Sequence, residues 1–249
     1  MRVLGTTVVG SAGRSRYVLM GRVKGFVEDF ERLAMELLGR AGLPRGTPVF
    51  LTAADLRRSY VSASCEVDGA RAEVHATFGL SGMACLDGGT GAGGTLNVLI
   101  SWNVGASRRG LLDALRVASE VKGALSVLSG LSCRSSAAVG TVSDATLVAL
   151  PPGREVYFGL ATPQGRAGAC ALSRAFSRYV MGMEAGRRLA MALGLEGGSC
   201  EGVAPEEEAL VRAIRLAALA ASSGLSPAPP LRGSLGRLLR DVEGRCSPA

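Results

Sequence analysis

The sequence has one histidine, few aromatic residues and no long apolar run, and each shortage excludes a class of protein. The single histidine, His75, excludes a metal site built from several histidines. No stretch approaches the roughly 18 uninterrupted apolar residues that a membrane-spanning helix needs. Because the amino terminus also lacks the charged and apolar regions of a signal peptide, we expect a cytoplasmic protein.

The chain carries a net charge of +7, but its basic residues are spread along 249 residues rather than clustered. Aromatic residues make up 4% of the chain, and no nucleic-acid-binding motif accompanies them. We therefore interpret the charge as a source of solubility and of attraction for an anionic ligand, and we expect no nucleic-acid partner. Self-association into a homo-oligomer stays open.

The cysteines are widely separated, and no C-x-x-C pair occurs among them. This spacing argues against a zinc site and against a dense disulfide framework. We expect free thiols in a reducing compartment. The six residues are Cys65, Cys85, Cys133, Cys170, Cys200 and Cys246.

Hydrophobic periodicity indicates a mixed α/β (α+β) fold, in which helices flank a mixed β-sheet core and the C-terminal third is helical. Residues 59–67 and 70–80 alternate and flank Asp68-Gly69, which is a strong hairpin signal. The short runs "VLGTTVVG" and "RYVLMGRV" predict an N-terminal hairpin, and helical spacing predicts helices over 26–40 and 111–128, with Ser107 as N-cap of the second. We expect a single domain over residues 1–225 and a proline-containing tail over 226–249.

The stretch "AVGTVSDATLVAL", residues 138–150, ends in an apolar run typical of a buried strand. Directly before that strand come Gly140, Thr141, Ser143 and Asp144. Two hydroxyls and a carboxylate at this place suit a catalytic site. They equally suit a polar turn in which Asp144 binds backbone groups.

The helix predicted over 111–128 places Lys122 on the same stripe as its apolar residues, with Glu120 on the opposite face. A buried, unpaired ammonium is costly, so an inward Lys122 needs a carboxylate partner. The alternative is a lysine near the helix end that extends to solvent. Only two lysines occur in the chain, which favours a specific need for this amine.

A glycine-rich segment, "SGMACLDGGTGAGG" at 81–94, lacks the spacing of a phosphate-binding P-loop and has no helix directly after it. We interpret it as a flexible substrate loop. Cys85 in this loop could act as a nucleophile with His75 as base, but most free cysteines are small apolar fillers.

Five segments in this order resemble the adenosylcobinamide amidohydrolase family, and a sixth resembles it more weakly over residues 155–176. The five are "FLTAADLRRSYV", "ATFGLS", "GGTLNVLISWN", "ASEVKGALSVL" and "VGTVSDATLVALP". Each motif is short, but their order and spacing together are fairly specific.

The resemblance implies hydrolysis of one amide of adenosylcobinamide, which removes aminopropanol and yields adenosylcobyric acid for coenzyme B12 synthesis. Cobalt would arrive inside the corrinoid substrate, so no cofactor is expected. The alternatives are a corrinoid-binding carrier without activity, or a nucleotide-binding enzyme that uses the glycine-rich loop.

Within the matching motifs, we expect four catalytic residues and a set of substrate-binding residues. In one version Thr141 or Ser143 is the nucleophile and Lys122 its base; in the other Asp144 activates water and Lys122 stabilises the oxyanion. The catalytic candidates are Lys122, Thr141, Ser143 and Asp144, and the substrate-binding candidates are Thr52, Asp55, Thr95, Asn97, Glu120 and Gly140.

Overall fold

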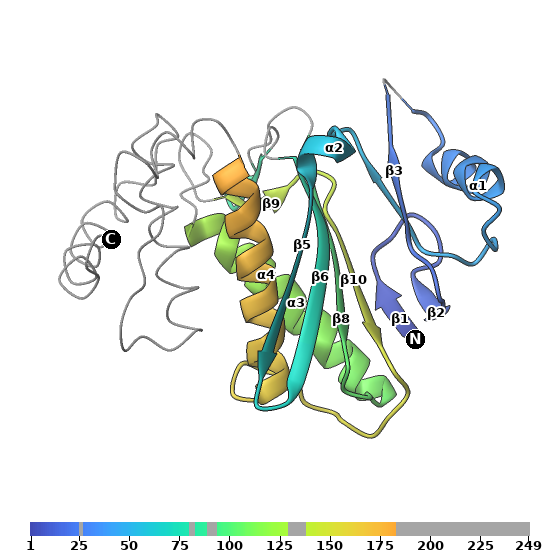
Figure 1. Cartoon of the computed structure of the whole chain (residues 1–249). Coiled ribbons are helices and arrows are strands. Elements are labelled where there is room, and N and C mark those ends of the chain that lie inside the picture. Colours follow the sequence, from blue (N-terminus) through green and yellow to red (C-terminus); the bar gives the residue numbers. More distant parts are fainter. Residues whose placement is uncertain (25–26, 80–82, 89–93, 129–137, 183–249) are drawn as a thin grey trace, which may run out of the picture.

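A computed structural model of the chain describes residues 1–182, apart from 25–26, 80–82, 89–93 and 129–137 (Figure 1). The predicted tail and the last part of the predicted domain lie outside these residues. The strands are β1 (Arg2–Gly5), β2 (Ala12–Arg14), β3 (Leu19–Arg22), β4 (Val49–Thr52), β5 (Tyr60–Val67), β6 (Ala70–Gly79), β7 (Met83–Cys85), β8 (Thr95–Trp102), β9 (Ala138–Thr141) and β10 (Ala145–Leu150). The helices are α1 (Phe30–Arg40), α2 (Leu56–Ser59), α3 (Arg108–Leu128) and α4 (Pro163–Gly182).

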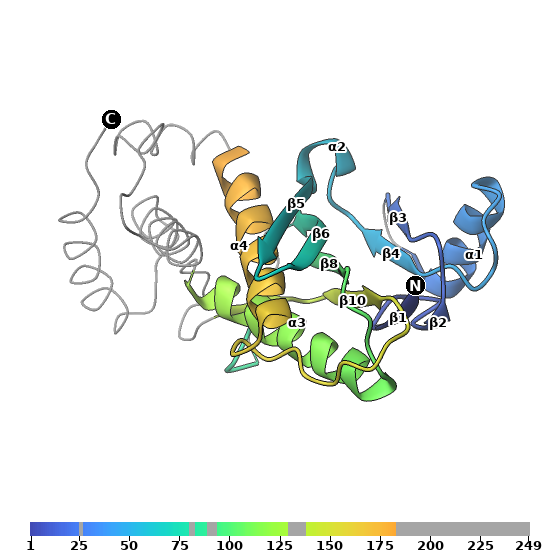
Figure 2. The ribbon, with the colours of Figure 1, turned by 60° about the horizontal axis from the view of Figure 1, so that its bottom comes forward.

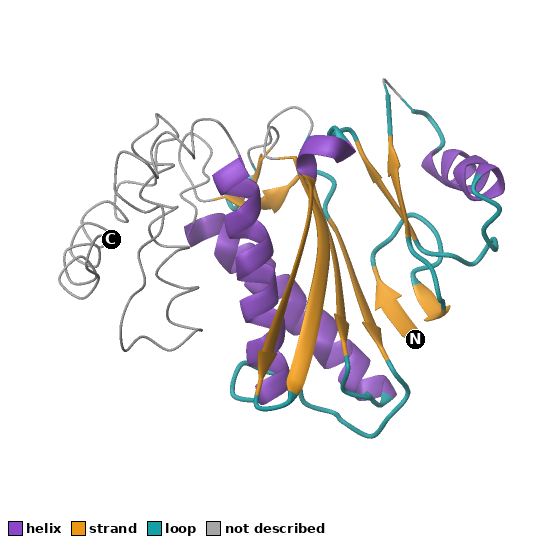
Figure 3. Ribbon diagram, in the orientation of Figure 1, coloured by secondary structure: helices purple, strands orange, loops and turns teal. Residues whose placement is uncertain are grey.

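The core is a six-stranded mixed sheet in the order β2-β1-β10-β8-β6-β5. Only β8 and β10 pair in parallel, and the other neighbours are antiparallel. Helices α3 and α4 cover one face of this sheet (Figure 3). The predicted mixed α/β class is therefore confirmed.

The two sheet faces differ because alternate side chains along each strand point to opposite sides. Leu96, Val98, Ile100 and Trp102 of β8 pack against the helices. The residues between them face the other way, toward a second layer made by the parallel pair β3–β4 with α1 outside it (Figure 2). Phe50 of β4 closes a smaller core on this side of the sheet.

Several local signals gave the right elements. The hairpin β5–β6 turns at Asp68 and Gly69, which both have positive φ, as a two-residue turn of this type requires. Ser107 caps α3 by accepting the Gly110 N–H at 3.1 Å. Helix α1 begins at Phe30, later than predicted, because the Asp29 side chain caps it by accepting the Arg32 N–H at 2.9 Å.

The predicted N-terminal hairpin is wrong. β1 pairs with β2 on one side and with β10 on the other, whereas β3 pairs in parallel with β4. Each strand thus has one partner that is distant in the sequence, β10 for β1 and β4 for β3, and there it buries an apolar face that a two-stranded hairpin would leave exposed.

The prediction of free thiols is also wrong for the described cysteines. Cys65 of β5 and Cys170 of α4 form a disulfide across 105 residues, and Cys85 is disulfide-bonded as well. The argument for a reducing compartment, which assumed free thiols, loses that support. Among the described residues, no helix combines the length and the apolar composition needed to cross a bilayer.

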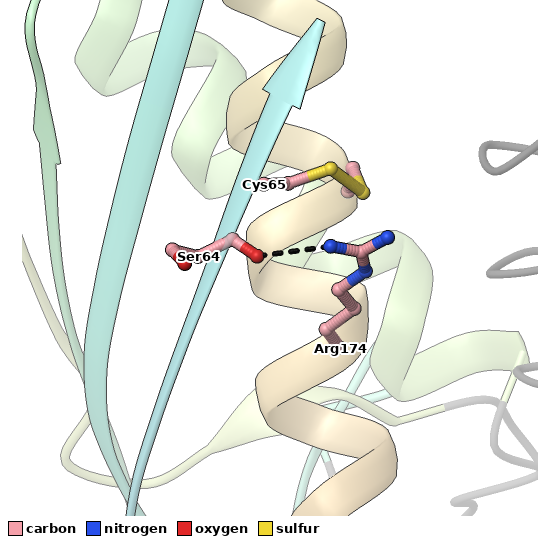
Figure 4. Close-up of a disulfide and its surroundings, with 4 residues drawn as sticks. Ser64, Cys65 and Arg174 are labelled. Atoms are coloured by element: carbon pink, nitrogen blue, oxygen red, sulfur yellow. Dashed lines mark hydrogen bonds between the residues drawn. A yellow bond between two sulfur atoms is a disulfide. The ribbon is translucent and has the colours of Figure 1, made fainter.

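Helix α4 also covers the outer edge of β5. The Arg174 and Arg178 guanidiniums donate to the backbone oxygens of Ser64 and Ser62 at 3.0 and 2.5 Å. Figure 4 shows Arg174 bound beside the disulfide. Edge-strand carbonyls that would otherwise remain open to another strand are therefore bonded within the chain.

Replacing both Cys65 and Cys170 by alanine should lower the free energy of unfolding by about 2–4 kcal/mol, because the unfolded chain loses a cross-link that closes a long loop. Urea unfolding followed by circular dichroism measures the change. Peptide mapping without reductant supplies the control, since the wild-type digest should contain a peptide of Cys65 joined to one of Cys170. Unlinked peptides in the wild type would contradict the assignment.

A carboxylate on α3 gives the fold an acid-sensitive contact. Asp113 accepts the Phe158 N–H at 2.6 Å through Oδ2, and its Oδ1 binds the Arg116 guanidinium at 2.9 Å. Burial raises the pKa of Asp113, but the hydrogen bonds from Phe158 and Arg116 and the charges of Arg116 and Arg109 outweigh it, so the pKa lies below its usual value.

Because the folded state lowers this pKa, Asp113 contributes stability above the pKa of the unfolded chain and loses it as the pH falls through the folded value. Asp113→Asn should therefore be less stable than the wild type at pH 7, and the two proteins should converge as the pH falls below about 4. Unfolding curves between pH 2 and 7 measure both. A constant difference across that range would contradict the assignment.

Candidate active site

The residues predicted to carry chemistry meet where the two parallel strands begin. Thr95 is the first residue of β8, and Asp144 directly precedes β10. Ala145 pairs with Asn97, so the amino ends of both strands lie side by side. The last turns of α3 and strand β9 lie at this same end of the sheet (Figure 1).

Lys122 points inward from α3 and forms an ion pair with Asp144. Its Nζ lies 3.2 Å from Asp144 Oδ2, and the two side chains are only 11% and 16% exposed. Of the two alternatives left open by the sequence, the structure has the inward orientation rather than extension to solvent. Burying either charge here without the other would cost free energy, so each residue requires its partner.

Asp144 is the centre of this cluster because three donors converge on its carboxylate. Oδ1 accepts the Leu96 backbone N–H at 2.8 Å and the Thr141 hydroxyl, while Oδ2 faces Lys122. Gly140 leaves room for it: a Cβ there would lie 2.4 Å from Asp144 Oδ2. Three donors therefore hold the carboxylate in place, and the absence of a side chain at Gly140 leaves the space that it occupies.

A second pair of hydroxyls lies beside the carboxylate. Thr95 Oγ1 and Ser143 Oγ are 2.8 Å apart, and Ser143 Oγ donates to the Gly94 carbonyl at 2.9 Å. Since Ser143 has one hydroxyl proton, Thr95 is the donor between the two. Ser143 is exposed, whereas Thr95 and Thr141 are each 5% exposed. Ser143 is therefore the hydroxyl that an incoming molecule meets.

Three predicted substrate-binding residues form hydrogen bonds with the backbone of the protein itself. Asn97 Nδ2 donates to the Leu51 carbonyl of β4 at 2.9 Å, and its residue is 1% exposed. Thr52 Oγ1 accepts the Ala54 N–H at 3.1 Å, and Asp55 caps α2 by accepting the Arg57 N–H. Thr52 and Asn97 thus lie close to the cluster but beneath its surface.

Glu120 does not join the cluster. It lies on the outer face of α3, as predicted from spacing, and binds the Arg116 guanidinium at 2.7 Å. Its side chain is 55% exposed.

His75 and Cys85 do not form the nucleophilic pair considered from the sequence. Cys85 is disulfide-bonded and so has no thiolate to offer. His75 Nδ1 lies 2.7 Å from the Tyr60 hydroxyl, and Nε2 lies 3.3 Å from Glu73. These side chains are on the sheet face opposite α3.

A groove of about 690 Å³ lies on that face, between the sheet and the N-terminal layer. Because Leu99 and Ser101 of β8 line it, whereas Lys122 approaches from α3, the sheet separates this groove from the ion pair. The other lining residues are Met1, Val3, Ser15, Arg16, Tyr17, Val18, Met20, Leu56, Arg57, Tyr60, His75 and Ala149.

Sequence reasoning missed Thr77, which pairs directly with Asn97 between β6 and β8. Thr77 is fully buried on the sheet face away from the helices. Only its place in the alternation of residues 70–79 could have indicated that it shares a face with His75. Within the described part of the chain, no group of three or more His, Cys, Asp or Glu residues is placed to hold a metal.

Comparison with known proteins gives one finding. A family model described as adenosylcobinamide amidohydrolase matches residues 1–180. No curated protein and no solved structure matches the chain.

Proposed function

The chain belongs to the adenosylcobinamide amidohydrolase family, and we propose that it hydrolyses the amide that joins aminopropanol to adenosylcobinamide, giving adenosylcobyric acid. The observation that carries this proposal is the Lys122–Asp144 ion pair, little exposed and surrounded by hydroxyls at the start of β8 and β10. Amide hydrolysis needs a base, a group that stabilises the oxyanion and an acid for the leaving amine. This cluster offers candidates for all three.

Between the two versions of the mechanism, the geometry favours Asp144 as the base. Lys122 faces a carboxylate at 3.2 Å, an arrangement that calls for an ammonium, and an ammonium has no lone pair with which to accept a proton. Its positive charge suits the oxyanion instead. Asp144 can take a proton while the Leu96 N–H and Lys122 keep its position.

The positions of the two hydroxyls favour water as the nucleophile. Thr141 donates to Asp144 but is 5% exposed, and exposed Ser143 contacts Thr95 and the Gly94 carbonyl rather than a base. Water gives a proton to Asp144 as its oxygen bonds to the amide carbon, and the oxyanion forms against Lys122. Asp144 then returns the proton to the nitrogen, the C–N bond breaks, and aminopropanol leaves.

Lys122→Met and Asp144→Asn should each lower kcat by about a thousandfold or more, because each removes a charge that the transition state requires. The assay follows adenosylcobyric acid and aminopropanol by mass spectrometry. Lys24→Met is the matched control: it removes the chain's other lysine, which is exposed, and should keep wild-type turnover.

Full turnover in the folded Lys122 and Asp144 variants would contradict this site. A wild-type protein that binds adenosylcobinamide without releasing product would support the corrinoid carrier instead. Accumulation of an acyl-enzyme at Thr141, detected as a mass increase on that peptide, would show that the threonine hydroxyl, and not water, is the nucleophile.

Gly140→Ala should fold normally yet lose most of its activity. The added Cβ would lie 2.4 Å from Asp144 Oδ2, at the end of a side chain that can move away, so the cost falls on the position of the carboxylate. A shift of about 1 Å in a reacting group can lower the rate about a hundredfold. Gly39→Ala, with nothing within 4 Å of its added Cβ, is the control and should keep full activity. Equal turnover in both variants would show that Asp144 needs no fixed position.

A further inference from the structure

Two buried polar atoms of the described residues lack hydrogen-bond partners where β6 pairs with β8. Thr77 and Asn97 are paired residues of these strands and are 0% and 1% exposed. Thr77 Oγ1 and Asn97 Oδ1 have no hydrogen-bond partner among the described residues. Buried polar groups in folded proteins are nearly always bonded to protein or to ordered water, so two such atoms at paired positions call for a shared partner.

The orientation of Asn97 is fixed, which leaves its oxygen needing a donor. Its Nδ2 donates to the Leu51 carbonyl, and the flipped amide would set two oxygens against each other. Thr77 stands directly opposite on the neighbouring strand, yet its hydroxyl makes no bond to Asn97. Ser59, next to the residue that pairs with Thr77, has a third buried hydroxyl without a partner.

We propose that Thr77 and Asn97 bind one internal water beneath β4, and that Thr77 is thereby a positioning residue of the active site. A water can donate to Asn97 Oδ1 and bond to the Thr77 hydroxyl at once, which satisfies both buried atoms. The water keeps the Asn97 side chain in the orientation that holds Leu51.

Asn97 links the end of β4 to the start of β8, which is why its orientation matters. Through Leu51 it holds the end of β4, where Thr52 leads into the turn toward Asp55. Two residues before Asn97, on the same face of β8, Thr95 holds Ser143. Loss of the water frees Asn97 to rotate and loosens the end of β4 beside this cluster. The kinetic part of this inference rests on the proposed hydrolase function.

Thr77→Val tests the water because it removes the hydroxyl and keeps the shape. If the hydroxyl is simply unsatisfied, valine removes a buried polar group and the protein becomes more stable. If the hydroxyl holds a water, valine either leaves that water with one partner fewer or expels it and leaves Asn97 Oδ1 without a donor, and stability falls in both cases. The sign of the change in melting temperature therefore separates the two cases without any substrate.

The experiment compares Thr77→Val, Thr77→Ser and Thr7→Val by thermal unfolding and by steady-state kinetics with adenosylcobinamide. Thr77→Val should melt below the wild type and lose about tenfold in kcat through misplacement of the site, with KM within about twofold. Thr77→Ser, which keeps the hydroxyl, should restore both. Thr7 is the control: its buried hydroxyl donates to Val9 O at 2.9 Å, so Thr7→Val should lower the melting temperature and leave kcat unchanged.

A melting temperature of Thr77→Val equal to or above that of the wild type would overturn the water site. A lower melting temperature with unchanged kcat would overturn the positioning role. If the wild-type protein does not hydrolyse adenosylcobinamide, the proposed function fails, and the melting temperatures still decide whether the water is bound.

Discussion

The parallel pairing of β8 and β10 is the constraint on which the site depends. Parallel neighbours need a crossover, and α3 supplies it on the covered face of the sheet. Lys122 lies 14 residues after the first residue of α3, so the helix carries the chain about 21 Å back along the sheet before it reaches Lys122. The eight residues of β8 span about 23 Å, so Lys122 arrives level with the start of the strand, where Asp144 lies.

Local sequence signals predicted the elements better than their partners. The strands at 95–102 and 145–150, the Asp68-Gly69 turn and the inward face of α3 follow from periodicity and turn chemistry within short windows. The partner of β1 is β10, more than 140 residues away, and alternation within a strand carries no information about such a distant partner. The Cys65–Cys170 disulfide was missed for the same reason, since only the packing of α4 on β5 brings the two cysteines together.

The candidate site was predictable in part. Helical spacing placed Lys122 on the apolar stripe of its helix, and the polar residues before β10 identified Asp144, but neither observation paired the two residues. The order of the family motifs supplied that link. Burial of Asn97 could not be predicted, because it depends on β4 packing against β8, and β4 is held there by its parallel pairing with β3 and by α1. Thr77 was missed because a threonine in an alternating strand has no signal of its own.

The choice of lysine at position 122 is itself an argument for chemistry. A little-exposed ion pair contributes little net stability, and apolar residues of similar volume often serve as well or better. The chain uses arginine for 26 of its 28 basic residues, so composition alone would place arginine here. A guanidinium is a wide, planar fork, whereas an ammonium is a compact charge that can face a carboxylate and an oxyanion in turn. A lysine at this position, which neither stability nor composition favours, supports the proposed role of Lys122 in balancing a developing negative charge.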